Sequence, residues 1–169
     1  MLEDRVRRLQ RYGASTITMA CNTACILTDR LQKEISIPFV SVVDEVVRKV
    51  VHKGTPVLIL ASPASLRLDL YQLQLARFGV GFVVPRLSDF QELEFIIRGV
   101  IEGDIRGMLM RKLVRITERY VEKKNIGGII LGCTELPLVF PTNYRLPVFS
   151  SLSILAESLL KQYYINEIV

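Results

Sequence analysis

The chain has 169 residues, of which 50% are hydrophobic and 23% charged, a composition typical of a globular protein with one compact domain or two small lobes. No apolar stretch approaches the roughly 18 residues of a membrane-spanning helix, and the acidic start argues against a signal peptide, so we expect a cytoplasmic protein without a membrane partner. The net charge of +5 suits a polyanion or a small acidic substrate, but the first basic residues follow a helical stripe and predict no nucleic-acid partner.

Short β-branched runs alternate with longer amphipathic stretches, which predicts a parallel α/β fold. The predicted strands are residues 15–20, 38–41, 56–61, 80–84, 127–131 and 147–149. The predicted helices are residues 2–12, 23–34, 42–52, 64–78, 89–101, 105–124 and 152–163. Gly13 ends the first helix, Ser62 and Pro63 begin the fourth, and Ser88 or Asp89 is expected to cap the fifth.

Two of the predicted strands end in similar sequences that contain a cysteine. Residues 18–23 read TMACNT, and residues 130–135 read ILGCTE. Because ligands of open parallel sheets bind at the carboxyl ends of the strands, Cys21 and Cys133 are expected to face one cleft from two lobes.

The residues around these cysteines favour acid–base chemistry on a small dicarboxylate. A thiol just before a helix N-terminus is stabilised as the thiolate, so we expect a lowered pKa at Cys21 and, less directly, at Cys133. Substrate carboxylates are expected to be bound by the following residues, Asn22, Thr23, Thr134 and Glu135. One sulfur would then remove the Cα proton as thiolate, and the other would protonate the opposite face as thiol.

Other chemistries have less support in the sequence. Cys25 lies one helical turn after Cys21 and suits inert packing. His52 is the single histidine, so neither a metal centre nor a Ser-His-Asp triad is predicted. A nucleotide cofactor is not expected either, because the chain has no glycine-rich phosphate loop. The odd number of cysteines, three, argues against a disulfide framework.

The two cysteine motifs resemble the paired catalytic motifs of the aspartate/glutamate racemase superfamily. These are Ala20 to Ala24 and Gly132 to Pro137, and the likeness extends to residues 37–41, 97–105 and 146–149. The resemblance implies catalytic roles for Cys21 and Cys133, no pyridoxal phosphate or metal, and a homodimer. It also implies two pseudo-symmetric, three-layer lobes, one of residues 1–52 and 146–169 and one of residues 53–145.

The same resemblance implies that the family's opening strand and glycine-rich loop have no counterpart here. The predicted activity is racemisation of aspartate or glutamate. Two alternatives remain open: a truncated, inactive relative that serves as a binding or oligomerisation module, and a related isomerase acting on maleate or a hydantoin.

Overall fold

The computed structural model describes residues 1–51, 54–105 and 107–167. The strands are β1 Ile17–Thr18, β2 Phe39–Val40, β3 Val57–Ala61, β4 Phe82–Val83, β5 Gly128–Gly132 and β6 Val148–Ser150. The α-helices are α1 Leu2–Arg11, α2 Thr28–Gln32, α3 Val42–Val50, α4 Pro63–Arg67, α5 Leu70–Arg77, α6 Leu87–Ile101, α7 Gly107–Val121 and α8 Ser151–Glu167. Two 3-10 helices, η1 Thr23–Leu27 and η2 Leu136–Val139, follow the two cysteine motifs.

Two parallel sheets confirm the predicted α/β fold. The larger sheet has the order β4-β3-β5-β6, and β3 pairs with β5 over its full length, from Val57 opposite Gly128 to Ala61 opposite Gly132. Every residue of β3 and β5 is buried, which explains why both strands read as continuous apolar runs rather than alternating ones.

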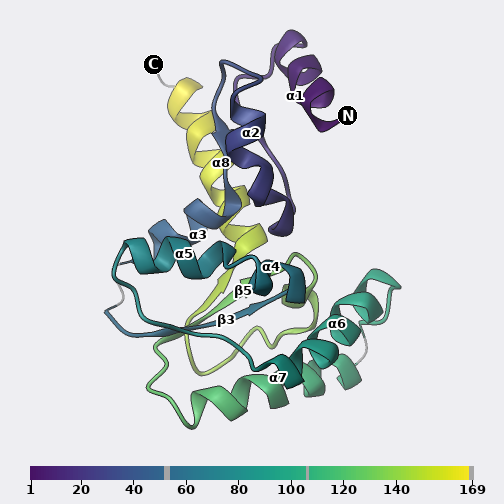
Figure 1. Ribbon diagram of the computed structural model, residues 1–169, viewed down its shortest axis with the longest axis vertical. Helices are drawn as coiled ribbons and strands as arrows, with labels where there is room; N and C mark the ends of the chain where they lie inside the picture. Colours follow the sequence, from purple (N-terminus) through teal and green to yellow (C-terminus); the bar gives the residue numbers. More distant parts are fainter. Residues whose placement is uncertain (52–53, 106, 168–169) are drawn as a thin grey trace.

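Helices cover both faces of the larger sheet. Figure 1 shows α3 and α5 on one side and α6 and α7 on the other, the layering expected of a parallel sheet. The apolar side chains of these layers form one large core with those of β3 and β5. None of the helices in the described ranges is long and apolar enough to cross a lipid bilayer.

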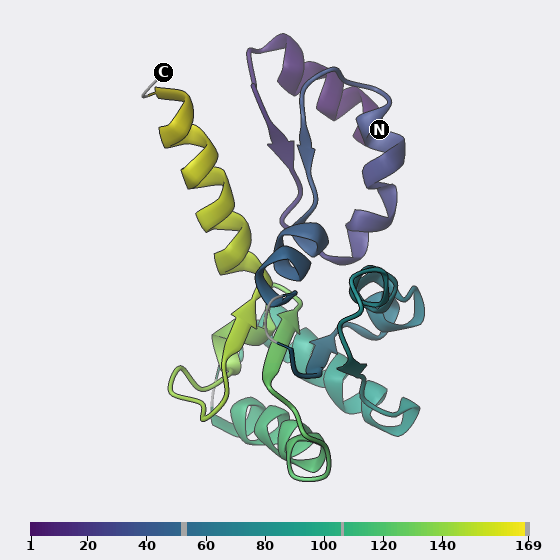
Figure 2. The same ribbon diagram turned by 90° about the vertical axis from the view of Figure 1, so that its left-hand side faces the viewer.

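The smaller sheet consists of β1 and β2 alone among the described residues. Its core is correspondingly small, with Val6, Ile17, Leu31 and Phe39 as its buried members. Figure 2 shows α1 and α2 on one side of these strands and α8 on the other. Because parallel pairing of two short strands contributes little stability, this part of the chain depends on its contacts with the rest of the molecule.

The packing departs from the predicted division into lobes at two places. The strand predicted at residues 147–149 was assigned to the first lobe, but β6 pairs with β5 and therefore completes the sheet of the second lobe. The apolar face of α3 also belongs to the large core, although residues 42–50 were assigned to the first lobe. The first lobe keeps a core of its own only up to β2.

Some of the predicted helices differ from the observed ones in their bounds, and two predicted helix ends agree. The helix predicted over residues 64–78 is interrupted at Asp69, whose φ of 51° lies in the left-handed region. The fifth predicted helix begins before Ser88 and Asp89, so neither caps it, and Arg86 precedes the first turn without a side-chain cap. Gly13, with φ of 90°, and the Ser62 cap, which accepts from Ser65 N at 3.2 Å, agree with prediction.

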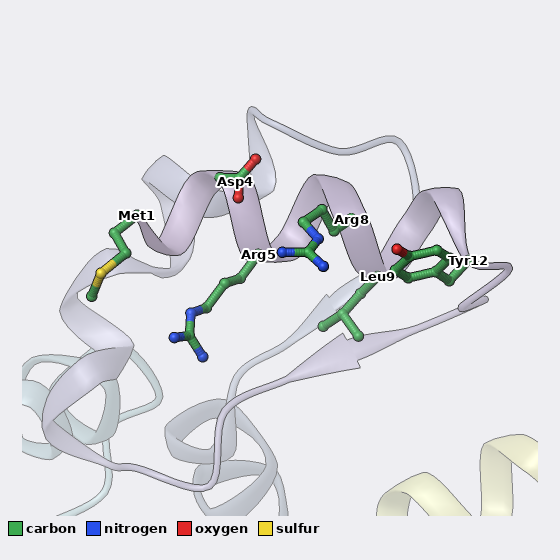
Figure 3. A pocket seen from close by; sticks show the side chains of 6 residues that line it. All are labelled: Met1, Asp4, Arg5, Arg8, Leu9 and Tyr12. Carbon is green, nitrogen blue, oxygen red and sulfur yellow. The ribbon is translucent and has the colours of Figure 1, made fainter.

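A surface hollow of about 540 Å³ lies beside α1. Figure 3 shows that its lining comes from this helix and the residues next to it, namely Met1, Asp4, Arg5, Arg8, Leu9 and Tyr12. Since a single helix supplies the lining side chains, the hollow is not an enclosed site.

Close contact between β5 and β6 generates a prediction about stability. A Cβ atom at Gly128 would lie 2.7 Å from the Phe149 ring and 3.3 Å from the Pro147 carbonyl oxygen. We expect Gly128→Ala to lower the free energy of unfolding by about 1–3 kcal/mol in urea titrations, because the added methyl overpacks the sheet. Gly107→Ala is the matched control, since its Cβ would meet only the end of the Arg111 side chain. Equal stability of the two variants would contradict the packing argument.

Candidate active site

The loop that carries Cys21 is attached to the carboxyl edge of the larger sheet. Cys21 follows β1 and is exposed. Two residues later, the Thr23 hydroxyl lies 3.1 Å from that of Ser62 and 2.9 Å from that of Ser65. The two serine hydroxyls are themselves 3.1 Å apart, so three hydroxyls form a closed triangle. Because Ser62 directly follows β3, this triangle places the Cys21 loop at the end of that strand.

Asn22 makes a second attachment from the same loop. Its side chain is buried, and its Nδ2 donates to the Ser151 hydroxyl at 3.0 Å. The hydroxyl of Tyr71, a fully buried residue of α5, donates to the Asn22 Oδ1. Burial raises the pKa of Tyr71, so the phenol stays a hydrogen-bond donor throughout the physiological range. Both ends of the Asn22 amide are therefore satisfied inside the protein.

These two attachments hold the Cys21 loop at the carboxyl ends of the strands on either side of β5. Ser62 follows β3 and Ser151 follows β6, and β5 lies between these two strands in the sheet. Cys133 is the residue after β5, so it lies between the anchoring points of Thr23 and Asn22. The pKa of Cys133 is consistent with this position, because a charge on Cys21 is among the causes that raise it.

The environment of Cys133 corrects one prediction. Burial and the neighbouring Glu135 carboxylate raise the pKa of this thiol to about 12, whereas the sequence predicted a lowered value. The thiol donates to Glu135 Oε2 at 2.9 Å, and the Thr134 hydroxyl donates to the same oxygen at 2.8 Å. The prediction failed because η2 has only four residues and the nearest charge is an anion. In this conformation Cys133 is a proton donor.

Tyr71 contacts both motifs. A Cβ atom at Gly132 would lie 2.5 Å from the Tyr71 ring and 3.2 Å from the Ala61 Cβ, so only glycine fits before Cys133. The same tyrosine donates to Asn22. One side chain thus packs against the end of β5 and holds the residue after Cys21.

All four residues predicted to bind substrate, Asn22, Thr23, Thr134 and Glu135, lie in the two motifs and make hydrogen bonds within the protein. Their role toward a substrate stays a prediction.

Cys25 has different surroundings from the other two cysteines. It is half-buried, and burial raises its pKa. Its sulfur donates to the Cys21 carbonyl at 3.8 Å and lines a cavity of about 170 Å³ whose lining includes neither Cys21 nor Cys133. The other residue considered for alternative chemistry, His52, lies outside the described residues. In the described part of the chain, no three His, Cys, Asp or Glu side chains gather as metal ligands would.

The sequence interpretation missed the residues that anchor the Cys21 loop, which are Ser62, Ser65, Tyr71 and Ser151. Position indicated only Ser62, which directly follows the strand predicted at residues 56–61, whereas Ser151 follows the observed β6 and lies two residues after the strand predicted at residues 147–149. No pattern pointed to Tyr71, which reads as one apolar position of an amphipathic helix.

The sequence is similar to a protein family and to several known proteins. Residues 1–159 match the family model described as Asp/Glu/Hydantoin racemase. A glutamate racemase from Aquifex pyrophilus is 31% identical over 136 residues, which are 78% of this chain and 50% of that enzyme. The chain thus spans about half the length of the glutamate racemases that it matches.

Solved structures of related proteins superpose on most of the chain. An aspartate racemase homologue from Pyrococcus horikoshii OT3 superposes with a TM-score of 0.84 at 33% identity, over 95% of this chain and 72% of that one. An aspartate racemase from Picrophilus torridus superposes with a TM-score of 0.80 at 25% identity, over 95% and 67% of the two chains.

The hydrogen bond from Tyr71 to Asn22, called the Asn22 bridge below, generates a prediction about stability. Tyr71→Phe keeps the ring beside Gly132 but leaves the buried Asn22 Oδ1 without its donor. We expect the free energy of unfolding to fall by about 1–3 kcal/mol, the cost of an unsatisfied buried acceptor. Tyr12→Phe removes the same hydroxyl from a residue that is 79% exposed and should change stability by less than about 0.5 kcal/mol. If urea titrations gave equal changes for both, the Asn22 bridge would carry no stability.

The raised pKa of Cys133 predicts its reactivity. Glu135→Gln removes the carboxylate charge while keeping an oxygen that can accept from the thiol, so the pKa of Cys133 should fall from about 12. At pH 9 we expect Cys133 alkylation by iodoacetamide to accelerate about tenfold, the gain in thiolate for a pKa lower by one. Peptide mass spectrometry separates the three cysteines, and the exposed Glu157→Gln is the control. An unchanged Cys133 rate in Glu135→Gln would show that burial alone sets this pKa.

Proposed function

The chain belongs to the Asp/Glu/hydantoin racemase family, and from that membership we propose that it interconverts the enantiomers of aspartate or glutamate. The observation that carries the proposal is the attachment of the Cys21 loop to the strand ends on either side of Cys133. Two thiols from different parts of the chain can then reach a small substrate from two sides.

The proposed reaction is a proton transfer at Cα with inversion. Cys21, as thiolate, removes the Cα proton and becomes a thiol. The carbanion is then protonated on its other face by the Cys133 thiol, which becomes a thiolate. The reverse direction exchanges the two roles. Both steps use only side chains of this chain, and the substrate gains and loses one proton in each cycle.

Glu135 has a specific role in this scheme. A Cys133 thiolate beside a charged Glu135 is unfavourable, which is part of the reason for the raised pKa of the thiol. The Cys133 thiol donates to Glu135 Oε2 at 2.9 Å, so the carboxylate keeps the proton on the sulfur and fixes its direction. We propose that Glu135 holds Cys133 in the thiol form until it delivers its proton to Cα, and that in the reverse direction the Cys133 thiolate regains a proton by taking it from Cα.

The substrate carboxylates require hydrogen-bond donors, and the two threonines of the motifs are suitably placed. We propose that the hydroxyls of Thr23 and Thr134 exchange their present partners for the substrate. Such an exchange costs little, since one hydrogen bond replaces another and the net difference is on the order of 1 kcal/mol. A homodimer is proposed on the family resemblance alone, and a cytoplasmic location on the composition of the sequence.

A second candidate function follows from the hydrogen bonds inside the site. All four predicted binding residues already have partners within the protein, and the smaller sheet has only two strands among the described residues. Both observations suit a silent relative that acts as a binding or oligomerisation module. The related isomerase reactions on maleate or a hydantoin would use the same two thiols.

Hydrogen exchange in deuterium oxide tests the proposal. Purified protein incubated with each enantiomer of aspartate and glutamate should incorporate deuterium at Cα, detected by proton NMR, and lose optical rotation. Cys21→Ser and Cys133→Ser should each lower the rate at least about 100-fold, the usual contribution of one acid–base group. Cys25→Ser is the matched control and should retain the rate, because Cys25 faces a separate cavity.

The alternatives give different results in the same experiment. Conversion of maleate to its trans isomer, or deuterium exchange into a hydantoin, without exchange into either amino acid, would assign the chain to a related isomerase. No reaction of any of these compounds with a folded protein would favour the silent module. Full activity of either single serine variant would refute the two-thiol mechanism.

A further inference from the structure

A further cavity, of about 310 Å³, lies between the start of α6 and the end of α7. Its position differs from that of the cysteines. Val83, which lines it, pairs with Leu58 near the start of β3, whereas Cys133 follows the residue paired with Ala61 at the other end. The cavity is therefore separate from the proposed active site.

Positive charge dominates the lining of this cavity. It contains Arg86, Lys123 and Lys124, which come from two segments far apart in the sequence. Within the described residues none of these three side chains forms an ion pair or hydrogen bond. Arg119 also lines the cavity, but it is already bound to Asp89 at 2.9 Å and to Glu92 at 3.4 Å.

The one carboxylate in the lining does not neutralise these cations. Asp89 is buried and accepts from the Tyr120 hydroxyl as well as from Arg119. The Tyr120 hydroxyl in turn accepts from the backbone N–H of Arg86 at 2.7 Å. These bonds fix the shape of the cavity wall and occupy the Asp89 carboxylate. Arg86, Lys123 and Lys124, all three exposed, therefore have no anionic partner among the described residues that line the cavity.

The start of α6 makes the excess of positive charge more unfavourable. An N-terminal turn carries partial positive charge and normally has an acceptor at its cap, but here Arg86 occupies that position without a side-chain cap. Lys123 and Lys124 follow the C-terminus of α7, where the helix dipole favours positive charge. Arg86 lies at the N-terminus of α6, where the dipole disfavours it. Natural proteins break such local rules mainly at functional sites.

We infer that this cavity binds a phosphate monoester of a small organic compound. The phosphate dianion would be held by Arg86, Lys123 and Lys124, which match its charge and its oxygen acceptors. The apolar part would lie on Val83, Val84 and the ring of Tyr120. The volume is at the lower end of the range for ligand pockets, which suits a compact ligand. This inference does not depend on the proposed racemase activity.

Calorimetric titration with phenyl phosphate and with inorganic phosphate, at low ionic strength, tests the inference. Phenyl phosphate should bind, and more tightly than inorganic phosphate, because only the ester reaches the apolar wall. The double variant Lys123→Gln/Lys124→Gln should weaken binding about tenfold or more, the loss expected for two charged contacts. The control is Lys33→Gln/Lys161→Gln, which removes the same charge from exposed positions elsewhere.

Each result either supports or overturns the site. Selective loss in Lys123→Gln/Lys124→Gln, with the control within about twofold of the parent protein, would support it. Equal weakening in both double variants would show attraction by net charge alone and overturn it. Absence of binding to the parent protein, or equal affinity for the two phosphates, would also overturn it.

Discussion

The buried amide of Asn22 is the interaction on which the arrangement of the site depends. This side chain comes from the loop after β1, and its two polar ends are bound by Tyr71 of α5 and by Ser151 at the start of α8. The first lobe has only four buried core residues of its own, so its internal packing fixes the Cys21 loop weakly. An unsatisfied buried amide is costly, and the loop avoids that cost only in the position where Tyr71 and Ser151 meet it.

The same constraint gives the two thiols different properties. Cys21 is exposed on a loop that is anchored by the neighbouring Asn22 and Thr23, whereas Cys133 follows a fully buried strand and lies beside a carboxylate. Two chemically identical side chains can thereby take complementary protonation roles in the proposed reaction, one as base and the other as acid. The difference arises from burial and from a single neighbouring charge, the two effects that raise the pKa of Cys133.

Much of the fold was predictable because it depends on local periodicity and on glycine and proline positions. All six strands and the α/β class were predicted, since β3 and β5 read as apolar runs between amphipathic helices. The partner of β6 was not, because the strand order of a sheet depends on long-range packing. For the site, the motifs predicted that Cys21 and Cys133 would meet. The role of Tyr71 depends on contacts between segments far apart in the chain, about which local sequence says nothing. The pKa of Cys133 depends first on burial, which the packing of the whole sheet sets, and then on the neighbouring Glu135, whose effect the interpretation of the motif overlooked.

The hydroxyl triangle of Thr23, Ser62 and Ser65 has a consequence for how the lobes are joined. None of its members carries a charge, so neither acidity nor salt weakens this junction directly. Each hydroxyl can rotate and can equally donate or accept, so water molecules can replace the contacts one at a time. The hydroxyl contacts can therefore be exchanged singly for water or another ligand, while the buried Asn22 amide keeps the loop in its position.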